Sequence, residues 1–238
     1  FVASEQQRDL LERYYYIPAY HVHVVPYGIN TSYNQKPPRE SAILKRLNLP
    51  KDTKIILTSS SMVLAQELKN ILSAFERVVI KKPNTALIII GDGPKRREVE
   101  FHMLSLALGG KTHFVGALTD QERNDLIRSS DYFVSLYSKS SGFETTVLEA
   151  MLQKKTVIAS EVGTSSSVIE NGKDGFLTRP IDIKSLSRLL MELVSGHIDT
   201  LSIGHNAHQK ILKMFDPDRM VQDTMIAYEN ILKGKKSK

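Results

Sequence analysis

The sequence predicts an α/β fold built on a doubly wound parallel sheet. Apolar runs of strand length recur along the chain, and helical patterns fill the intervals between them. Several runs are apolar without alternation, as strands buried on both faces are. Three runs end in loops rich in glycine or serine that lead toward a helix. Ligands of such sheets bind beyond the carboxyl ends of the strands, so these loops are the first candidates for a binding site.

The predicted strands cover residues 21–25, 54–59, 86–90, 112–116, 132–137, 156–160 and 175–178. Between them, two sets of apolar residues each fall on one face of a helix: Leu68, Ile71, Leu72, Phe75, Val78 and Val79, and then Leu186, Leu189, Leu190, Leu193 and Val194. Thr119 with Glu122 forms a capping box, and Asp216 followed by Pro217 marks a further helix start.

Residues 19–214 are expected to form this domain, with residues 1–18 and 215–238 outside its sheet. Residues 4–16 and 217–233 each resemble a helix, the second with an apolar stripe that includes Val221 and Met225. The domain alone does not obviously cover these apolar faces. Either the two helices fold back onto the domain, or a neighbour covers them.

The composition is that of a globular protein, with 238 residues, 41% hydrophobic and 24% charged. There is no apolar run of about 18 residues, and the first residues are amphipathic, so neither a membrane span nor a secretory leader is expected. The absence of cysteine excludes disulfides and thiolate metal sites and fits a reducing compartment, so a cytoplasmic location is expected.

The net charge of +6 comes with basic clusters at 81–82, at 95–97 and in the tail KGKKSK. These clusters would suit a polyanionic partner or peripheral contact with an anionic inner membrane face, although a solvated tail is the more frequent meaning. No nucleic-acid partner is expected.

The first glycine loop is GDGP (91–94), directly after a predicted strand. Gly91 and Gly93 would let the backbone approach a ligand, although a strand-to-helix turn needs such residues on structural grounds alone. The loop matches neither GxGxxG nor a phosphate-binding P-loop, which disfavours an NAD dehydrogenase.

The second loop is SSGFETTVLEAM (140–151), which leads into a helix. Backbone N–H groups of Phe143, Glu144 and Thr145, after Gly142, would point toward an anion, helped by the helix dipole. Capping by serine or threonine is the structural alternative. Glu149 lies about one turn into the helix, where a carboxylate needs partners, and sugar hydroxyls are natural ones.

The third loop, EVGTSSSVIENGKDGF (161–176), is expected to open another helix with a serine-rich turn. Such turns are also common without a ligand. No metal site is expected: His21 and His23 alternate along a strand without acidic neighbours, and His205 with His208 lacks a third ligand. No cofactor is expected either.

Taken together, these segments resemble the C-terminal half of the nucleotide-sugar transferases called glycosyl transferases group 1. These are retaining enzymes of the GT-B architecture, in which two Rossmann-like domains face each other. The matching segments are VVPYGIN (24–30), LSAF (72–75), IIIGDGP (88–94), HFVGALTDQE (113–122), SSDYFVSLYS (129–138), GFETTVLEAM (142–151), TVIASEVG (156–163) and ENGKDGFLTRPID (170–182). The first residues resemble the last strand and helix of the family's N-terminal domain, and the final helix resembles the one that crosses back to it. The resemblance therefore implies a donor-binding half whose acceptor-binding half is removed or supplied separately.

The sequence also departs from the family's pattern. The family's first signature glutamate, eight residues before Glu149, is Ser141 here, and Glu144 replaces a glycine or proline. In the third loop Ser167 replaces a glutamate and Thr164 a glycine.

The basic pair that grips the donor diphosphate in the family falls near Ser61 and Gln66, neither of which is basic. Lys69, one helical turn beyond Gln66, would reach the phosphates instead or simply face solvent.

The resemblance implies a sugar-nucleotide-dependent glycosyltransferase whose donor carries UDP, GDP or ADP. The base would lie near Val115 and Gly116, and the ribose hydroxyls would bind Glu149, the candidate catalytic residue. Implied donor contacts are Gly91, Gly93, Val115, Gly116, Gly142, Phe143, Glu144, Thr145 and Glu149, with Ser61, Gln66 or Lys69 at the diphosphate. Replacing Glu149 by alanine is expected to weaken nucleotide binding with little change in melting temperature.

Two other functions fit less well. The missing basic pair and Ser141 favour a catalytically degenerate partner subunit or a carbohydrate- or nucleotide-binding module. A sugar-nucleotide epimerase would need acid and base carboxylates in the cleft, and only Glu144 and Glu149 are candidates.

Overall fold

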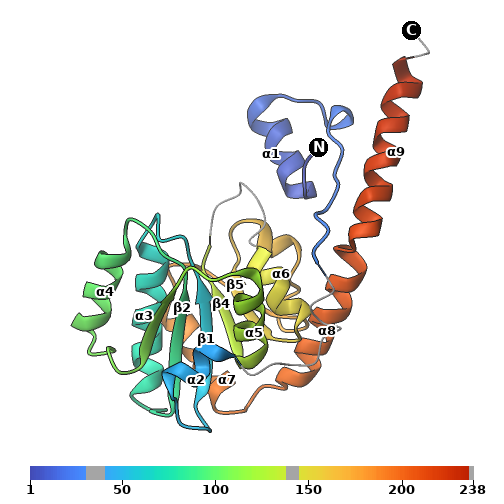
Figure 1. Cartoon of the computed structure of the whole chain (residues 1–238). Coiled ribbons are helices and arrows are strands. Elements are labelled where there is room, and N and C mark those ends of the chain that lie inside the picture. The colour runs from blue at the N-terminus through green and yellow to red at the C-terminus, as the bar shows by residue number, and fades with distance from the viewer. Residues whose placement is uncertain (31–40, 138–144, 236–238) are drawn as a thin grey trace.

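A six-stranded parallel sheet forms the centre of the computed structural model (Figure 1). The structure describes residues 1–30, 41–137 and 145–235. The strands lie in the order β3-β2-β1-β4-β5-β6, and every neighbouring pair is parallel. They are β1 Lys54–Ser59, β2 Thr85–Ile90, β3 Thr112–Gly116, β4 Tyr132–Ser135, β5 Thr156–Ser160 and β6 Phe176–Thr178. The predicted fold class is confirmed.

Helices cover both faces of the sheet, as the unbroken apolar strands require. One face carries α3 Gln66–Val79, α4 Arg96–Ser105 and α7 Ile183–Val194. The other carries α2 Ala42–Leu47, α5 Asp120–Ser129, α6 Thr145–Leu152 and α8 Thr200–Met214. Consecutive strand residues alternate between these layers, so Ile56 belongs to the first core and Leu57 to the second.

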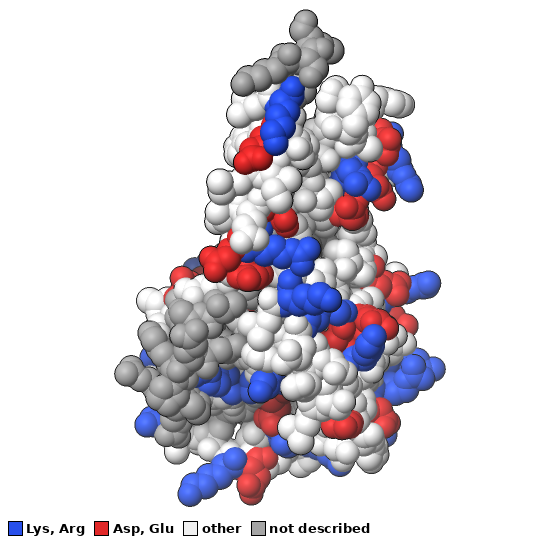
Figure 2. All heavy atoms as spheres, turned by 90° about the vertical axis from the view of Figure 1, so that its right-hand side faces the viewer, with Lys and Arg blue, Asp and Glu red and all other residues white. Residues whose placement is uncertain are grey.

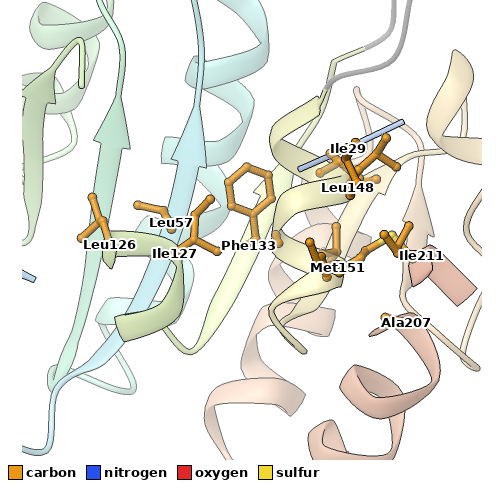
Figure 3. Close-up of a cluster of buried hydrophobic side chains, with 14 of the residues drawn as sticks. Ile29, Leu57, Leu126, Ile127, Phe133, Leu148, Met151, Ala207 and Ile211 are labelled. Carbon is orange, nitrogen blue, oxygen red and sulfur yellow. The ribbon is translucent and has the colours of Figure 1, made fainter. Parts of the chain in front are cut away.

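The second core is drawn in Figure 3, where Leu57 and Phe133 from the sheet lie near Ile127 of α5. Leu148 and Met151 of α6 continue the same core toward α8. This packing fixes the first turns of α5 and α6, which lie at the carboxyl edge of the sheet.

The strand order places a topological switch point between β1 and β4. From β1 the chain proceeds through β2 to β3 at one edge, and then returns to β4, on the other side of β1. The loop after β1 (60–65) therefore leads toward β2 on one side of this point, and β4 lies on the other side. A crevice for ligands is expected at such a point.

The two ends lie outside the sheet. Helix α1 Glu5–Tyr15 and the long helix α9 Pro217–Lys235 extend on the same side of the sheet, and α9 projects well beyond it (Figure 1). The Phe1 ring contacts the Tyr228 ring at 5.3 Å between centroids. Asp216 Oδ1 accepts from the Asp218 N–H, as its predicted capping role requires. Among the helices in the described ranges, none combines the length and apolarity that a membrane crossing needs.

The prediction of a strand at residues 21–25 is wrong. The segment begins within the 3-10 helix η1 Ala19–His21, and Val24 forms only an isolated bridge with Val2. The segment has the composition of a strand, but its backbone partner is the short N-terminal segment, with Val2 N–H donating to His23 O. A β-ladder needs a longer partner than this.

The third loop also differs from its prediction, because it opens a 3-10 helix, η3 Thr164–Ser167, and not an α-helix. Gly163 turns the chain at φ +96°, and the Ser166 hydroxyl donates to the Gly163 carbonyl. Serine side chains that bond locally to the backbone in this way compete with α-helix formation.

Candidate functional site

The loops after β1 and β2 lie in direct contact because both glycines of the GDGP turn lack a side chain. A Cβ on Gly93 would lie 2.0 Å from the Ser61 carbonyl oxygen, and a Cβ on Gly91 would lie 1.9 Å from that of Ser60. Gly91 also has a φ of +108°, which glycine adopts readily. The Lys95 N–H donates to Met62 O at 2.9 Å and closes the contact. The predicted residue Ser61 is thereby held at the carboxyl end of β1.

The end of β3 joins the same group of loops. The Gly91 N–H donates to Gly116 O at 2.8 Å, and the two glycines form an isolated bridge. Gly116 has a φ of +77°, and Val115 beside it is half-buried. The structure therefore brings Ser61, Gly91, Gly93, Val115 and Gly116 together at one edge of the sheet.

Gln66 and Lys69 begin helix α3 next to these loops. The Gln66 amide donates to Asn70 Oδ1 at 2.8 Å, and no side chain caps the start of the helix. Lys69 forms an ion pair with Glu98 of α4 at 2.6 Å. Hydrogen bonds from Lys69 and then Lys95 lower the pKa of Glu98 below its ordinary value. The Lys69 ammonium is therefore already paired, and its contact with phosphates stays a prediction.

Glu149 projects from α6 toward α5, where Arg123 holds both of its carboxylate oxygens. Arg123 Nε donates to Oε2 at 2.8 Å and Nη2 donates to Oε1 at 2.9 Å. The side chains are 20% and 19% exposed, so the pair is largely shielded from water. Arg123 Nη1 also contacts Asp120 at 2.9 Å. The hydrogen bond to Glu149 is the main cause that raises the pKa of Arg123 above its ordinary value.

This arrangement leaves Glu149 able to bind a further ligand. A carboxylate offers about four lone-pair positions, and Arg123 occupies two of them. The remaining positions can accept hydrogen bonds from hydroxyl groups. Two hydroxyls on adjacent carbons would suit them.

The second loop is only partly described. Thr145 is exposed and begins α6, whereas Thr146 is buried beside it. Gly142, Phe143 and Glu144 lie outside the described residues, and so does Ser141. Their roles at the diphosphate therefore stay predictions.

A surface groove of about 770 Å³ lies elsewhere, between α3 and α7. Arg77, Lys81 and Arg188 are among its lining residues, and none of the predicted donor contacts is. In the described ranges, no group of three or more His, Asp or Glu side chains is placed to hold a metal ion. His208 Nδ1 lies 2.5 Å from Leu152 O, which gives it a structural partner.

Sequence reasoning missed Arg123 and Glu98. Arg123 stands four residues after Thr119 in a helix start that was correctly predicted as a capping box. Its link to Glu149 joins two different helices, and no local pattern signals such a link. Glu98 likewise reaches Lys69 from a neighbouring helix.

Comparison with known proteins identifies the family of this chain. The model of the family "Glycosyl transferases group 1" matches residues 40–210. The chain belongs to this family. The matched range includes all six strands and the loops at their carboxyl ends.

One curated protein that the chain is similar to is O-antigen chain mannosyltransferase C from Escherichia coli. It is 26% identical over 151 residues, which cover 63% of this chain and 40% of that protein. The chain spans about half the length, or less, of the curated relatives that head the comparison.

Two solved structures share the fold closely. A glycosyltransferase from Rickettsia africae superposes with a TM-score of 0.86 at 23% identity, over 97% of this chain and 62% of that one. Anabaena HepE in complex with UDP and glucose superposes with a TM-score of 0.86 at 19% identity, over 96% of this chain and 62% of that one. At these identities the likeness shows the fold alone, a Rossmann-like parallel sheet covered by helices on both faces.

Proposed function

We propose that this chain is the donor-binding half of a retaining glycosyltransferase that uses a nucleotide-sugar. The observation that carries the proposal is the contact among the loops after β1, β2 and β3 at the carboxyl edge of the sheet, beside the switch point between β1 and β4. Open parallel sheets bind ligands at this position. Anabaena HepE, which has the same fold, was solved with UDP.

In this proposal the base lies near Val115 and Gly116, and the ribose hydroxyls bind Glu149. The diphosphate lies at the start of α6, at Thr145 and the residues just before it. There the N–H groups of a helix N-terminus favour negative charge. The chain's own contribution to the reaction is to position the donor and to stabilise the leaving diphosphate.

The acceptor-binding half is proposed to pack on α1 and α9. Tyr14, Tyr15 and Tyr16 of the α1 region are 71–87% exposed, and Met225 and Leu232 of α9 are about 60% exposed. Peripheral membrane contact is a weaker proposal. On the face shown in Figure 2, Lys and Arg side chains are interspersed with Asp and Glu and do not form a single basic patch.

The experiment is a calorimetric titration and a thermal-shift series with UDP, GDP and ADP. Saturable binding of one nucleotide is expected. At a hundred times its dissociation constant it should stabilise the fold by about 2.7 kcal/mol. The absence of both binding heat and thermal stabilisation with all three nucleotides would contradict the proposal.

A second function has one observation in its favour. Ser61 and Gln66 carry no charge, and the Lys69 ammonium is paired with Glu98. A catalytically degenerate partner subunit would show this pattern. Such a subunit would bind none of the three nucleotides in the titration and would still bind a separate acceptor-binding chain.

A further inference from the structure

The inference concerns Arg123, the partner of Glu149, and it rests on the proposed function. We propose that Arg123 is a positioning residue: it orients the Glu149 carboxylate so that two lone pairs face the 2′- and 3′-hydroxyls of the donor's ribose.

The geometry supports orientation more than simple charge pairing. Nε and Nη2 of one planar guanidinium contact the two oxygens of one carboxylate, at 2.8 and 2.9 Å. A bidentate contact of this kind fixes both the position and the rotation of the carboxylate plane. Arg123 is itself held from its other side by Asp120. A free glutamate side chain would instead sample several rotamers.

The charge balance indicates which ligand group this site accepts. Arg123 contributes one positive charge, and Asp120 and Glu149 contribute one negative charge each. The cluster is therefore not a substitute for the basic pair missing near Ser61 and Gln66, since its net charge repels a phosphate. The Glu149 carboxylate instead offers hydrogen-bond acceptors whose orientation is fixed, which suits neutral hydroxyl donors.

The location supports the same reading. Arg123 lies in the first turn of α5, which follows β3, and Glu149 lies in the second turn of α6, which follows β4. Both helix starts lie at the carboxyl edge, beside the loop where the base is proposed to bind. One buried core lies beneath both helices and contains Ile127 of α5 and Leu148 of α6, so the distance between the two turns is fixed by packing.

The test compares a ribonucleoside diphosphate with its 2′-deoxy form by calorimetric titration. The base is the one of UDP, GDP and ADP that the unmodified chain binds. That chain is expected to bind the ribonucleotide about tenfold or more tightly, because the deoxy form leaves a lone pair of a charged acceptor unused. In Arg123→Met this ratio should fall toward one, while the deoxy form binds almost as before.

Two further variants make the test specific. Arg123→Lys keeps the charge but can donate less directionally, so its ratio should lie between those of the unmodified chain and Arg123→Met. It also carries the test if Arg123→Met does not fold. Lys54→Met is the matched control, because it removes an ion pair with Asp131 of 2.9 Å at the opposite end of β1. Its ratio should equal that of the unmodified chain.

The outcomes separate this inference from the proposed function. If the unmodified chain binds none of the three nucleotides, the proposed function is refuted, and this inference with it. If the unmodified chain binds a nucleotide, and Arg123→Met loses affinity equally for the ribonucleotide and its 2′-deoxy form, Arg123 is merely structural. That result would overturn this inference and leave the proposed function standing. Equal affinity of the unmodified chain for the ribonucleotide and its 2′-deoxy form would overturn the inference as well.

Discussion

Replacing Gly93 by alanine tests how closely the loops after β1 and β2 must pack. The new Cβ would lie 2.0 Å from Ser61 O, whereas real Cβ contacts are not shorter than 3.0 Å, so the loops must separate by about 1 Å. A separation of that size would break the 2.9 Å hydrogen bond from Lys95 N–H to Met62 O. Overpacking costs about 1–3 kcal/mol and the lost hydrogen bond about 1 kcal/mol. The expected loss is therefore about 2–4 kcal/mol.

Urea denaturation measures this loss, and a thermal melt should show a decrease of at least about 4 °C for a chain of this size. Nucleotide affinity should fall as well, because the displaced loop contains Ser61. Gly110→Ala is the matched control: its Cβ would meet nothing within 4 Å, and any effect should be below about 1 kcal/mol and stabilising. Equal stability of the two variants would refute the claimed contact.

Three other substitutions test the ion pairs and the titrating groups. Glu149→Ala should weaken nucleotide binding about tenfold or more. The sequence alone suggested little change in stability, but the variant also removes the partner of Arg123, so the free energy of unfolding in urea should fall by about 1–2 kcal/mol. Unchanged binding would contradict the role of Glu149. Lys210→Met leaves the Asp174 side chain, 1% exposed, without its cation and should cost about 2–4 kcal/mol by the same assay. Adding Asp174→Asn should recover part of this loss, because asparagine removes the unpaired charge and its amide oxygen can still accept from the Glu170 N–H. Burial lowers the pKa of His113 below its usual 6.5, so the unfolded chain takes up the proton more readily and stability should fall as the pH drops below about 6.5. His113→Leu should flatten this decline by up to about 1.4 kcal/mol per pH unit, and identical pH profiles would argue against it.

A strand could be predicted from the sequence where its own residues are apolar enough to be buried on both faces. ALIII is apolar throughout, and every residue of β2, an interior strand of the sheet, is buried. HVHVV at 21–25 is also rich in β-branched residues, but the structure gives it only an isolated bridge with the N-terminal segment. Pairing is a property of two segments, so a pattern within one of them cannot settle it.

The site was predictable in its backbone and much less so in its side chains. Gly91 and Gly93 stood out because a close approach between backbones requires glycine, and the structure shows that approach. Gln66 and Lys69 lie on one helix, as their three-residue spacing suggested. The partner of Lys69 lies 29 residues away and that of Glu149 lies 26 residues away. Such pairs depend on how whole helices pack, which one sequence does not reveal.

The central claim is that the loops at the carboxyl edge beside β1 and β4 bind a nucleoside diphosphate. Amide hydrogen exchange with and without a saturating nucleotide tests it most directly. The account predicts slower exchange at 60–69, at 91–94, at 115–117 and in the first turns of α6. Protection confined to the groove between α3 and α7, or no protection of these loops despite saturation, would contradict it.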